Sequence, residues 1–147
     1  MKDLERYYYL GPWNERTVYC WVLKRKAIFQ DDKTIDSAHI LDQIFCSPTQ
    51  DYDFSNRLRL SNFLHNLYDE RLIYFDLNGV LKSDVLSKEY LQSIGIPKNA
   101  SLPRECLTDA RVEYLKQRIN DYHLYQYNKQ LRLHEKREIE NKHDKKR

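Results

Sequence analysis

The stretch LPRECLTDARVEYLK, at residues 102–116, decides the fold that we predict from the sequence. Pro103 fixes its own φ and pushes Leu102 into an extended conformation, so the chain enters the stretch along a set direction. Glu105 and Asp109 then place negative charge where a helix would begin, and such charge complements the helix dipole. We therefore expect an extended entry that leads directly into a helix.

This helix is predicted to begin near Thr108 and to run without a break to about residue 141. Leu115, Ile119 and Tyr122 form its apolar stripe, because residues three or four positions apart share a helix face. Beyond the stripe, the last nineteen residues read KQLRLHEKREIENKHDKKR and interleave acidic with basic groups. Such interleaving is typical of a solvated helix face rather than of a phosphate-binding block.

Two shorter helices are predicted upstream. The first starts at Asp36 or Ser37 as N-cap and ends before Pro48. Its apolar side consists of Ile40, Leu41, Ile44 and Phe45. The second covers residues 55–71, and one arc of its helical wheel is apolar. That arc consists of Leu60, Phe63, Leu64, Leu67 and Tyr68.

Turn signals place three further elements. Asn78-Gly79 between apolar residues predicts a small hairpin near residues 72–82. A short helix over residues 84–93 is predicted to stop at Gly95, a favourable residue just past a helix end. Near the amino terminus we predict a helix from Asn14, although residues 18–23 would also suit a buried strand.

These elements define a mainly α fold with several short helices, the small hairpin and a long C-terminal helix. The 147 residues fit one domain, and only three Gly and four Pro favour long regular elements. We divide the chain into an N-terminal extension of unknown role, residues 1–50, and a helical region, residues 51–147, that ends in the long charged helix.

No residue spacing in the sequence assembles an active site, so we predict that the protein is not an enzyme and binds no cofactor. There is no G-x-S-x-G, P-loop or G-x-G-x-x-G pattern. The three cysteines are widely separated and the five histidines lack metal-ligand spacing, which argues against disulfide or zinc sites. The longest apolar run has six residues, against the ~20 of a spanning helix, so no transmembrane segment is expected.

A DNA-binding alternative arises because three helices followed by a hairpin outline a winged helix. In that hypothesis the helix over residues 55–71 would read a major groove with Arg59, Asn62, His65 and Asn66. Residues 1–103 carry a net charge of −1, however, which does not favour binding to phosphates. The main hypothesis therefore includes no nucleic acid.

A protein partner suits the composition better, because twelve tyrosines are unusual and tyrosine is enriched where partners cover a surface. We predict that the partner is gripped by the stretch at residues 102–116, with outward-facing arginines as polar anchors and Leu102-Pro103 as the apolar entry. The candidate partner-binding residues are Leu102, Pro103, Arg104, Glu105, Arg111 and Lys116.

The same stretch resembles the small matrix-side subunit of the mitochondrial cytochrome bc1 complex, the 14-kDa ubiquinol–cytochrome c reductase binding protein or subunit 7 family. The resemblance covers about residues 79–125 and includes the GVLKSDVL segment at residues 79–86. The matching residues downstream are Leu102, Pro103, Arg104, Glu105, Asp109, Ala110, Arg111, Leu115 and Lys116. The chain departs from the family at Tyr114, Gln117 and Arg118, and residues 1–50 match no segment of it.

The resemblance implies a non-catalytic structural and assembly subunit of the respiratory chain, within complex III. Members of that family are helical, hold no cofactor and pack against cytochrome b and the core subunits. The implied location is peripheral, on the matrix side of the mitochondrial inner membrane. The expected role is thus that of an accessory subunit in an electron-transport complex.

Overall fold

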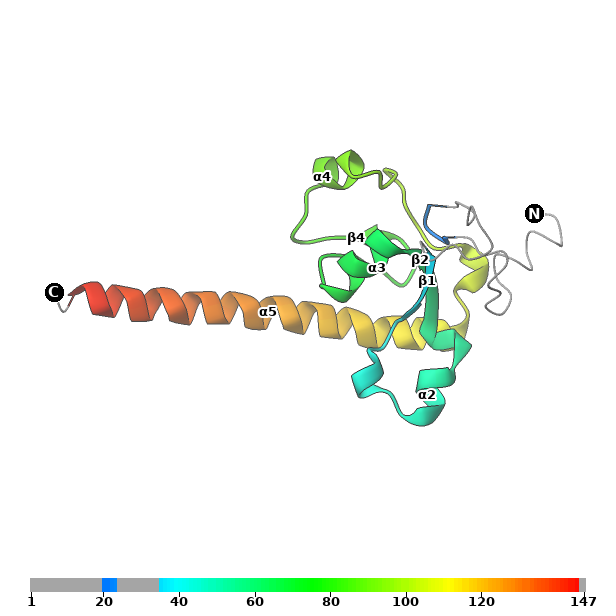
Figure 1. Cartoon of the computed structure of the whole chain (residues 1–147), viewed down its shortest axis with the longest axis horizontal. Helices are drawn as coiled ribbons and strands as arrows, with labels where there is room; N and C mark the ends of the chain where they lie inside the picture. The colour runs from blue at the N-terminus through cyan, green and yellow to red at the C-terminus, as the bar shows by residue number, and fades with distance from the viewer. Residues whose placement is uncertain (1–19, 24–34, 146–147) are drawn as a thin grey trace.

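The computed structural model describes residues 20–23 and 35–145, and Figure 1 shows a small body from which one long helix extends. The strands are β1 (Ile35–His39), β2 (Arg57–Ser61), β3 (Tyr74–Phe75) and β4 (Leu81–Lys82). The α-helices are α2 (Pro48–Tyr52), α3 (Asn62–Asp69), α4 (Lys88–Ser93) and α5 (Asp109–Lys145). Short 3-10 turns are η1 (Gln43–Phe45), η2 (Phe54–Asn56) and η3 (Arg104–Cys106).

The mainly helical composition and the long C-terminal helix are confirmed. Helix α5 alone has 37 residues, whereas the four described strands have five, five, two and two. The body that supports α5 is nevertheless built on strands. Its larger sheet joins β1 and β2 in antiparallel register, from Ile35 opposite Ser61 to His39 opposite Arg57.

That sheet overturns both short helices predicted upstream. The helix expected between Asp36 and Pro48 is wrong, because β1 occupies its first half and only the short turn η1 follows. The helix expected from Ser55 is wrong in its first half, since β2 precedes α3, which begins at Asn62. The reason is that β1 and β2 form hydrogen bonds with each other across about twenty residues of sequence. The spacing of apolar residues within each segment does not indicate such pairing.

Residues 20–23 complete the sheet region. They form a turn in which the amide of Trp21 donates to the carbonyl of Arg59 in β2 at 2.8 Å, and Cys20, Trp21 and Val22 are buried. The remainder of the helix predicted from Asn14 lies outside the described residues. The predicted division at residue 50 falls between β1 and β2, two strands of one sheet.

The predicted hairpin is confirmed, with Tyr74 opposite Lys82 and Phe75 opposite Leu81. Gly79 has φ +79° in its turn, and a side chain there would lie 3.2 Å from Leu102 and Leu107. The next helix, α4, begins after the N-cap Ser87, later than the predicted Asp84, and Gly95 follows its end with φ +95°, as expected.

Helix α5 confirms the predicted start, because the Thr108 hydroxyl accepts from the amide of Arg111 at 3.2 Å. Its buried side chains recur at three- and four-residue spacing and pack against the sheets. They are Arg111, Tyr114, Leu115, Arg118 and Tyr122. The last contacts with the body come from Tyr125, whose ring lies under Arg71, and from Gln126, which donates to the carbonyl of Arg71.

Candidate interaction surface

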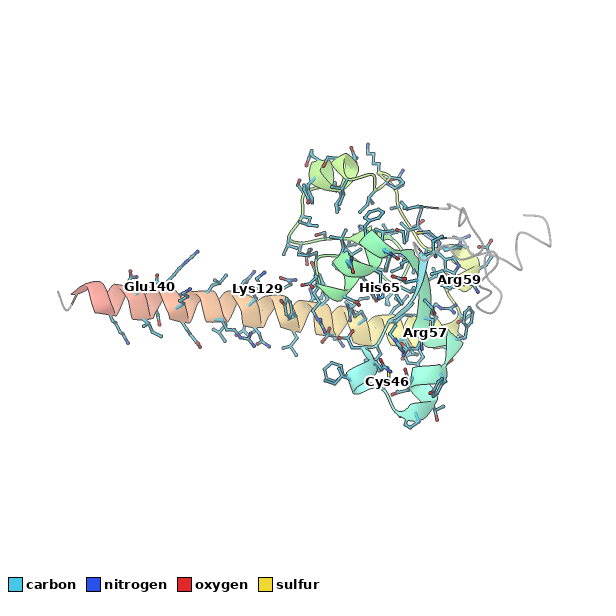
Figure 2. All side chains as sticks on the ribbon, viewed as in Figure 1. Cys46, Arg57, Arg59, His65, Lys129 and Glu140 are labelled. Carbon is cyan, nitrogen blue, oxygen red and sulfur yellow. The ribbon has the colours of Figure 1, made fainter. Side chains whose placement is uncertain are left out.

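Helix α5 divides at Gln126 into a rooted segment, residues 109–126, and a projecting segment, residues 127–145. Every side chain from 127 to 142 is exposed, and Figure 2 labels Lys129 and Glu140 where side chains spread from the helix on all sides. Along the described part of this segment the ion pair is His134 with Glu138, at 3.1 Å. The segment is mostly polar and is exposed on every side, which is typical of a helix that bridges to another body.

One face of the helix near this division is apolar. Leu124, Tyr127 and Leu131 are 60%, 62% and 42% exposed. Their spacing of three and then four residues places them on the same side of the helix. We call these three residues the distal stripe. The buried side chains of the rooted segment do not include them, so the stripe points away from the body.

A second apolar pair lies beside the root of the helix. Ile44 and Phe45 are 83% and 60% exposed, although the sequence predicts them on the buried side of a helix. They follow Asp42, whose carboxylate accepts a hydrogen bond from Arg118 of α5 at 2.7 Å. Cys46, labelled in Figure 2, continues the same loop next to α5. Ile44 and Phe45 therefore form a second exposed apolar patch, on the loop that follows β1.

Four charged side chains, which we call the root clamp, fix the rooted segment. Arg118 is only 2% exposed and bonds Asp42, while Arg71 bonds Asp42 at 2.6 Å and Asp121 at 2.8 Å. Arg118 also donates to the carbonyl of Tyr68, and its guanidinium lies 4.3 Å above the Tyr68 ring. These contacts join α5 to the ends of α3 and β1, so the direction of the projecting segment is set by the body.

Electrostatics within the root clamp favour the charged forms. Partial burial alone would raise the pKa of Asp42, but the charges and hydrogen bonds of Arg118 and Arg71 outweigh it and lower the pKa below its usual value. Burial alone would lower the pKa of Arg71, but bonds to Asp121 and Asp42 raise it. Both shifts favour the charged forms of Asp42 and Arg71 at neutral pH.

Arg111 lies inside the body, and the prediction that it faces outward is wrong. It is 4% exposed and donates to the carbonyls of Cys106, Phe54 and Arg57. Its guanidinium also lies 5.1 Å from the Trp21 ring and 5.3 Å from the Phe54 ring. Burial lowers the pKa of Arg111 from its ordinary value, and these carbonyls and ring faces solvate the cation in place of water.

The other predicted partner-binding residues separate into two groups. Leu102 and Pro103 are buried, and the amide of Leu102 donates to the carbonyl of Gly79 at 2.8 Å. Arg104, Glu105 and Lys116 are exposed, and Lys116 pairs with Glu113 at 3.0 Å. Residues 102–116, predicted to bind a partner, therefore serve mainly to attach α5 to the body. Three of the six candidate residues are at the surface.

The residues of the DNA-binding alternative are also separated. Arg59 lies in β2 and is 1% exposed, whereas Asn62 and Asn66 are exposed on α3. His65 bonds Asp36 at 2.8 Å and Asp69 at 3.1 Å, so two carboxylates stand beside it. Those carboxylates would repel a phosphate backbone.

Among the described residues no group of three His, Cys, Asp or Glu side chains could hold a metal ion. The three cysteines are free thiols, and burial raises the pKa of Cys106 to about 12. Within that same part of the chain, no helix combines the length and the apolar character needed to cross a membrane. No protein-family model matches the chain, and no curated protein matches it.

The sequence analysis did not single out Asp42 or Arg71, and it placed Ile44 and Phe45 on the buried side of a predicted helix rather than at the surface. A signal was available only for Arg118, which is three residues after Leu115 and four before Tyr122 and so falls within the apolar stripe of α5. A charged residue inside an apolar stripe indicates a buried partner of opposite charge. The partner, Asp42, is 76 residues away in the sequence, and no local pattern points to it.

Proposed function

We propose that the protein is a non-catalytic structural subunit that joins a larger assembly through helix α5. The observation that carries this proposal is the combination of a rigid root with an exposed distal stripe. The root clamp fixes the direction of α5, and the projecting segment presents Leu124, Tyr127 and Leu131 to solvent. An apolar stripe at helical spacing is what an amphipathic helix lays into the groove of a partner.

The energetic argument favours a partner over a free helix. Most helix stability in proteins comes from tertiary packing of an apolar face rather than from intrinsic propensity. The rooted segment has such packing and the projecting segment does not. Covering Leu124, Tyr127 and Leu131, together with Ile44 and Phe45, would remove the largest exposed apolar side chains around the helix root from water.

The assembly that we propose is the mitochondrial cytochrome bc1 complex, with the chain on the matrix side of the inner membrane. The support is the resemblance of residues 79–125 to the subunit 7 family. The matched residues lie in the hairpin and the loop after it, in the entry to η3, and in the rooted segment of α5, and Arg104 and Lys116 among them are exposed. Cytochrome b and the core subunits are the partners that this proposal names for the projecting segment.

The test is native electrophoresis of a gentle extract, with mass spectrometry of the band that holds the chain. We expect the wild-type chain in a band with complex III subunits, far above its own 17.9 kDa. The variant Leu124→Ser/Tyr127→Ser/Leu131→Ser should migrate alone, because loss of interfacial anchors costs association about 2 kcal/mol or more. Its helical circular dichroism should stay close to that of the control below.

The matched control is Lys129→Ser/Arg132→Ser/Lys136→Ser, which places the same three serines on the opposite side of the same helix. It should remain in the assembly. Migration of the wild-type chain as a free monomer would reject the subunit proposal altogether. A large band without complex III subunits would keep the subunit proposal and reject the cytochrome bc1 assignment.

A further inference from the structure

A cleft lies between α4 and the strand β4. In Figure 1, α4 and the segments that flank it arch away from the hairpin before the chain returns to α5. The cleft beneath this arch has a volume of about 450 Å³. Clefts of roughly 300–1,000 Å³ are the size class of small-molecule sites.

The backbone fixes the shape of this cleft. Next to the turn, the hairpin pairs with residues 100–102, since the amide of Leu81 donates to the carbonyl of Ala100 at 3.0 Å. Val80 and Ser101 form a further bridge. Past this pairing the two segments separate, and α4 closes the space between them. Leu81, Leu91 and Ile96 are buried and form an aliphatic floor.

All the charged residues that line the cleft are positive. Lys82, Lys88 and Lys98 line it, and none of the lining residues is acidic. Asp84 and Glu89 adjoin lining residues in the sequence but do not line the cleft themselves. The uncharged lining includes hydrogen-bonding side chains, namely Gln92, Asn99 and Ser101. An occupant would therefore meet three lysine side chains, neutral hydrogen-bonding side chains and an apolar floor.

We propose that this cleft binds a small phosphate monoester. Three lysines exceed what one carboxylate requires, whereas a phosphate monoester carries about −1.5 to −2 charges at neutral pH and three acceptor oxygens. Lysine binds phosphate as a point charge and needs no fixed bidentate geometry. The aliphatic floor and the neutral donors would then hold the carbon body and its hydroxyls. This binding activity goes beyond assembly through α5 and uses none of the same residues.

Isothermal calorimetry of the full chain at low ionic strength tests the proposal, with glycerol 3-phosphate as probe. We expect saturable binding of glycerol 3-phosphate, weaker binding of inorganic phosphate, which lacks the carbon body, and no binding of glycerol. Lys82→Gln/Lys88→Gln/Lys98→Gln should weaken binding at least about a hundredfold, because each charge-assisted hydrogen bond contributes about tenfold or more.

The matched control, Lys129→Gln/Lys136→Gln/Lys142→Gln, removes the same charge from the projecting segment of α5 and should change affinity less than about twofold. Equal weakening in both variants would mean that only net charge attracts the anion, and would overturn the proposal. Binding of butyrate or of an oligoglutamate peptide as tight as that of glycerol 3-phosphate would overturn the phosphate class. Absence of binding at millimolar probe would overturn the site.

Discussion

The two segments of α5 share one uninterrupted backbone but are supported in different ways. In the rooted segment, residues 109–126, buried side chains and the root clamp attach the helix to both sheets. In the projecting segment, residues 127–145, no described side chain up to 142 is buried. Continuity of a helix is thus no guide to continuity of its support. The difference also indicates where a partner would bind, because the side chains of the projecting segment are not needed to pack the core.

The composition of the projecting segment compensates in part for its lack of buried side chains. It is rich in Lys, Glu, Leu and Arg, which have high intrinsic helix propensity. It contains neither Gly nor Pro, either of which would break the helix. Propensity differences amount to tenths of a kcal/mol per residue, whereas one buried leucine contributes about 2 kcal/mol. The two segments should therefore respond very differently to the same substitution.

Replacing one leucine in each segment of α5 is the strongest test of this difference in support. Leu115→Ala should lower the free energy of unfolding by about 4 kcal/mol, because Leu115 is fully buried and its loss leaves a cavity. Leu131→Ala should change it by less than about 0.5 kcal/mol, since alanine is a good helix former and the site is exposed. Urea unfolding followed by circular dichroism measures both. Equal losses would show that the projecting segment packs against the body.

The root clamp offers the next largest effect. Asp42→Asn should lower the free energy of unfolding by about 3 kcal/mol at neutral pH, because it removes the closest counter-charge of the buried Arg118. Glu113→Gln, which removes an exposed partner of Lys116 on the same helix, should cost less than about 0.5 kcal/mol. Chemical unfolding of the two variants gives the comparison.

The pH dependence of that loss has a definite sign. The folded pKa of Asp42 is lowered, so its stabilisation is full above the ordinary value of 3.8 and is lost as the pH falls through the folded pKa. The difference between wild type and Asp42→Asn should be constant near neutrality and should shrink below about pH 4. A difference that grows on acidification would contradict the charge pairing.

The smallest of the three effects concerns the residues predicted to grip a partner. Arg111→Ala should cost about 2 kcal/mol of fold stability, because the carbonyls of Cys106, Phe54 and Arg57 lose their donor. Arg104→Ala should cost less than about 0.5 kcal/mol, as its side chain is exposed. Thermal unfolding of the single variants separates these roles, whereas a double variant would confuse lost folding with lost assembly. Two equally stable variants would place Arg111 at the surface.

The sequence predicted those elements that are encoded by neighbouring residues. Helix α5 follows from an acidic first turn and a stripe at helical spacing, and the hairpin follows from Asn78-Gly79. The end of α4 follows from Gly95, which takes the positive φ that other residues rarely adopt. In each case the deciding contacts span only a few residues, so the local pattern contains the information.

The β1–β2 sheet could not be predicted in the same way. Leu58 and Leu60 are both buried in β2, but one alternation is too short to indicate a strand, and Leu60 also fitted the apolar arc of the predicted helix. Its pairing with β1 depends on residues about twenty positions away. The candidate surface was missed for a related reason, because the exposure of Ile44 and Phe45 depends on where Asp42 meets Arg118.

The root clamp has a consequence for the order of events during translation. Asp42 and Arg118 are 76 residues apart, and at about 5–20 residues per second a ribosome needs roughly 4–15 s to add the second after the first. During that interval Asp42 and Arg71 have been made, but Arg118, the second guanidinium that bonds Asp42, has not. The contacts between the body and α5 can form only once α5 has been made, and a chaperone has those seconds in which to bind the nascent chain.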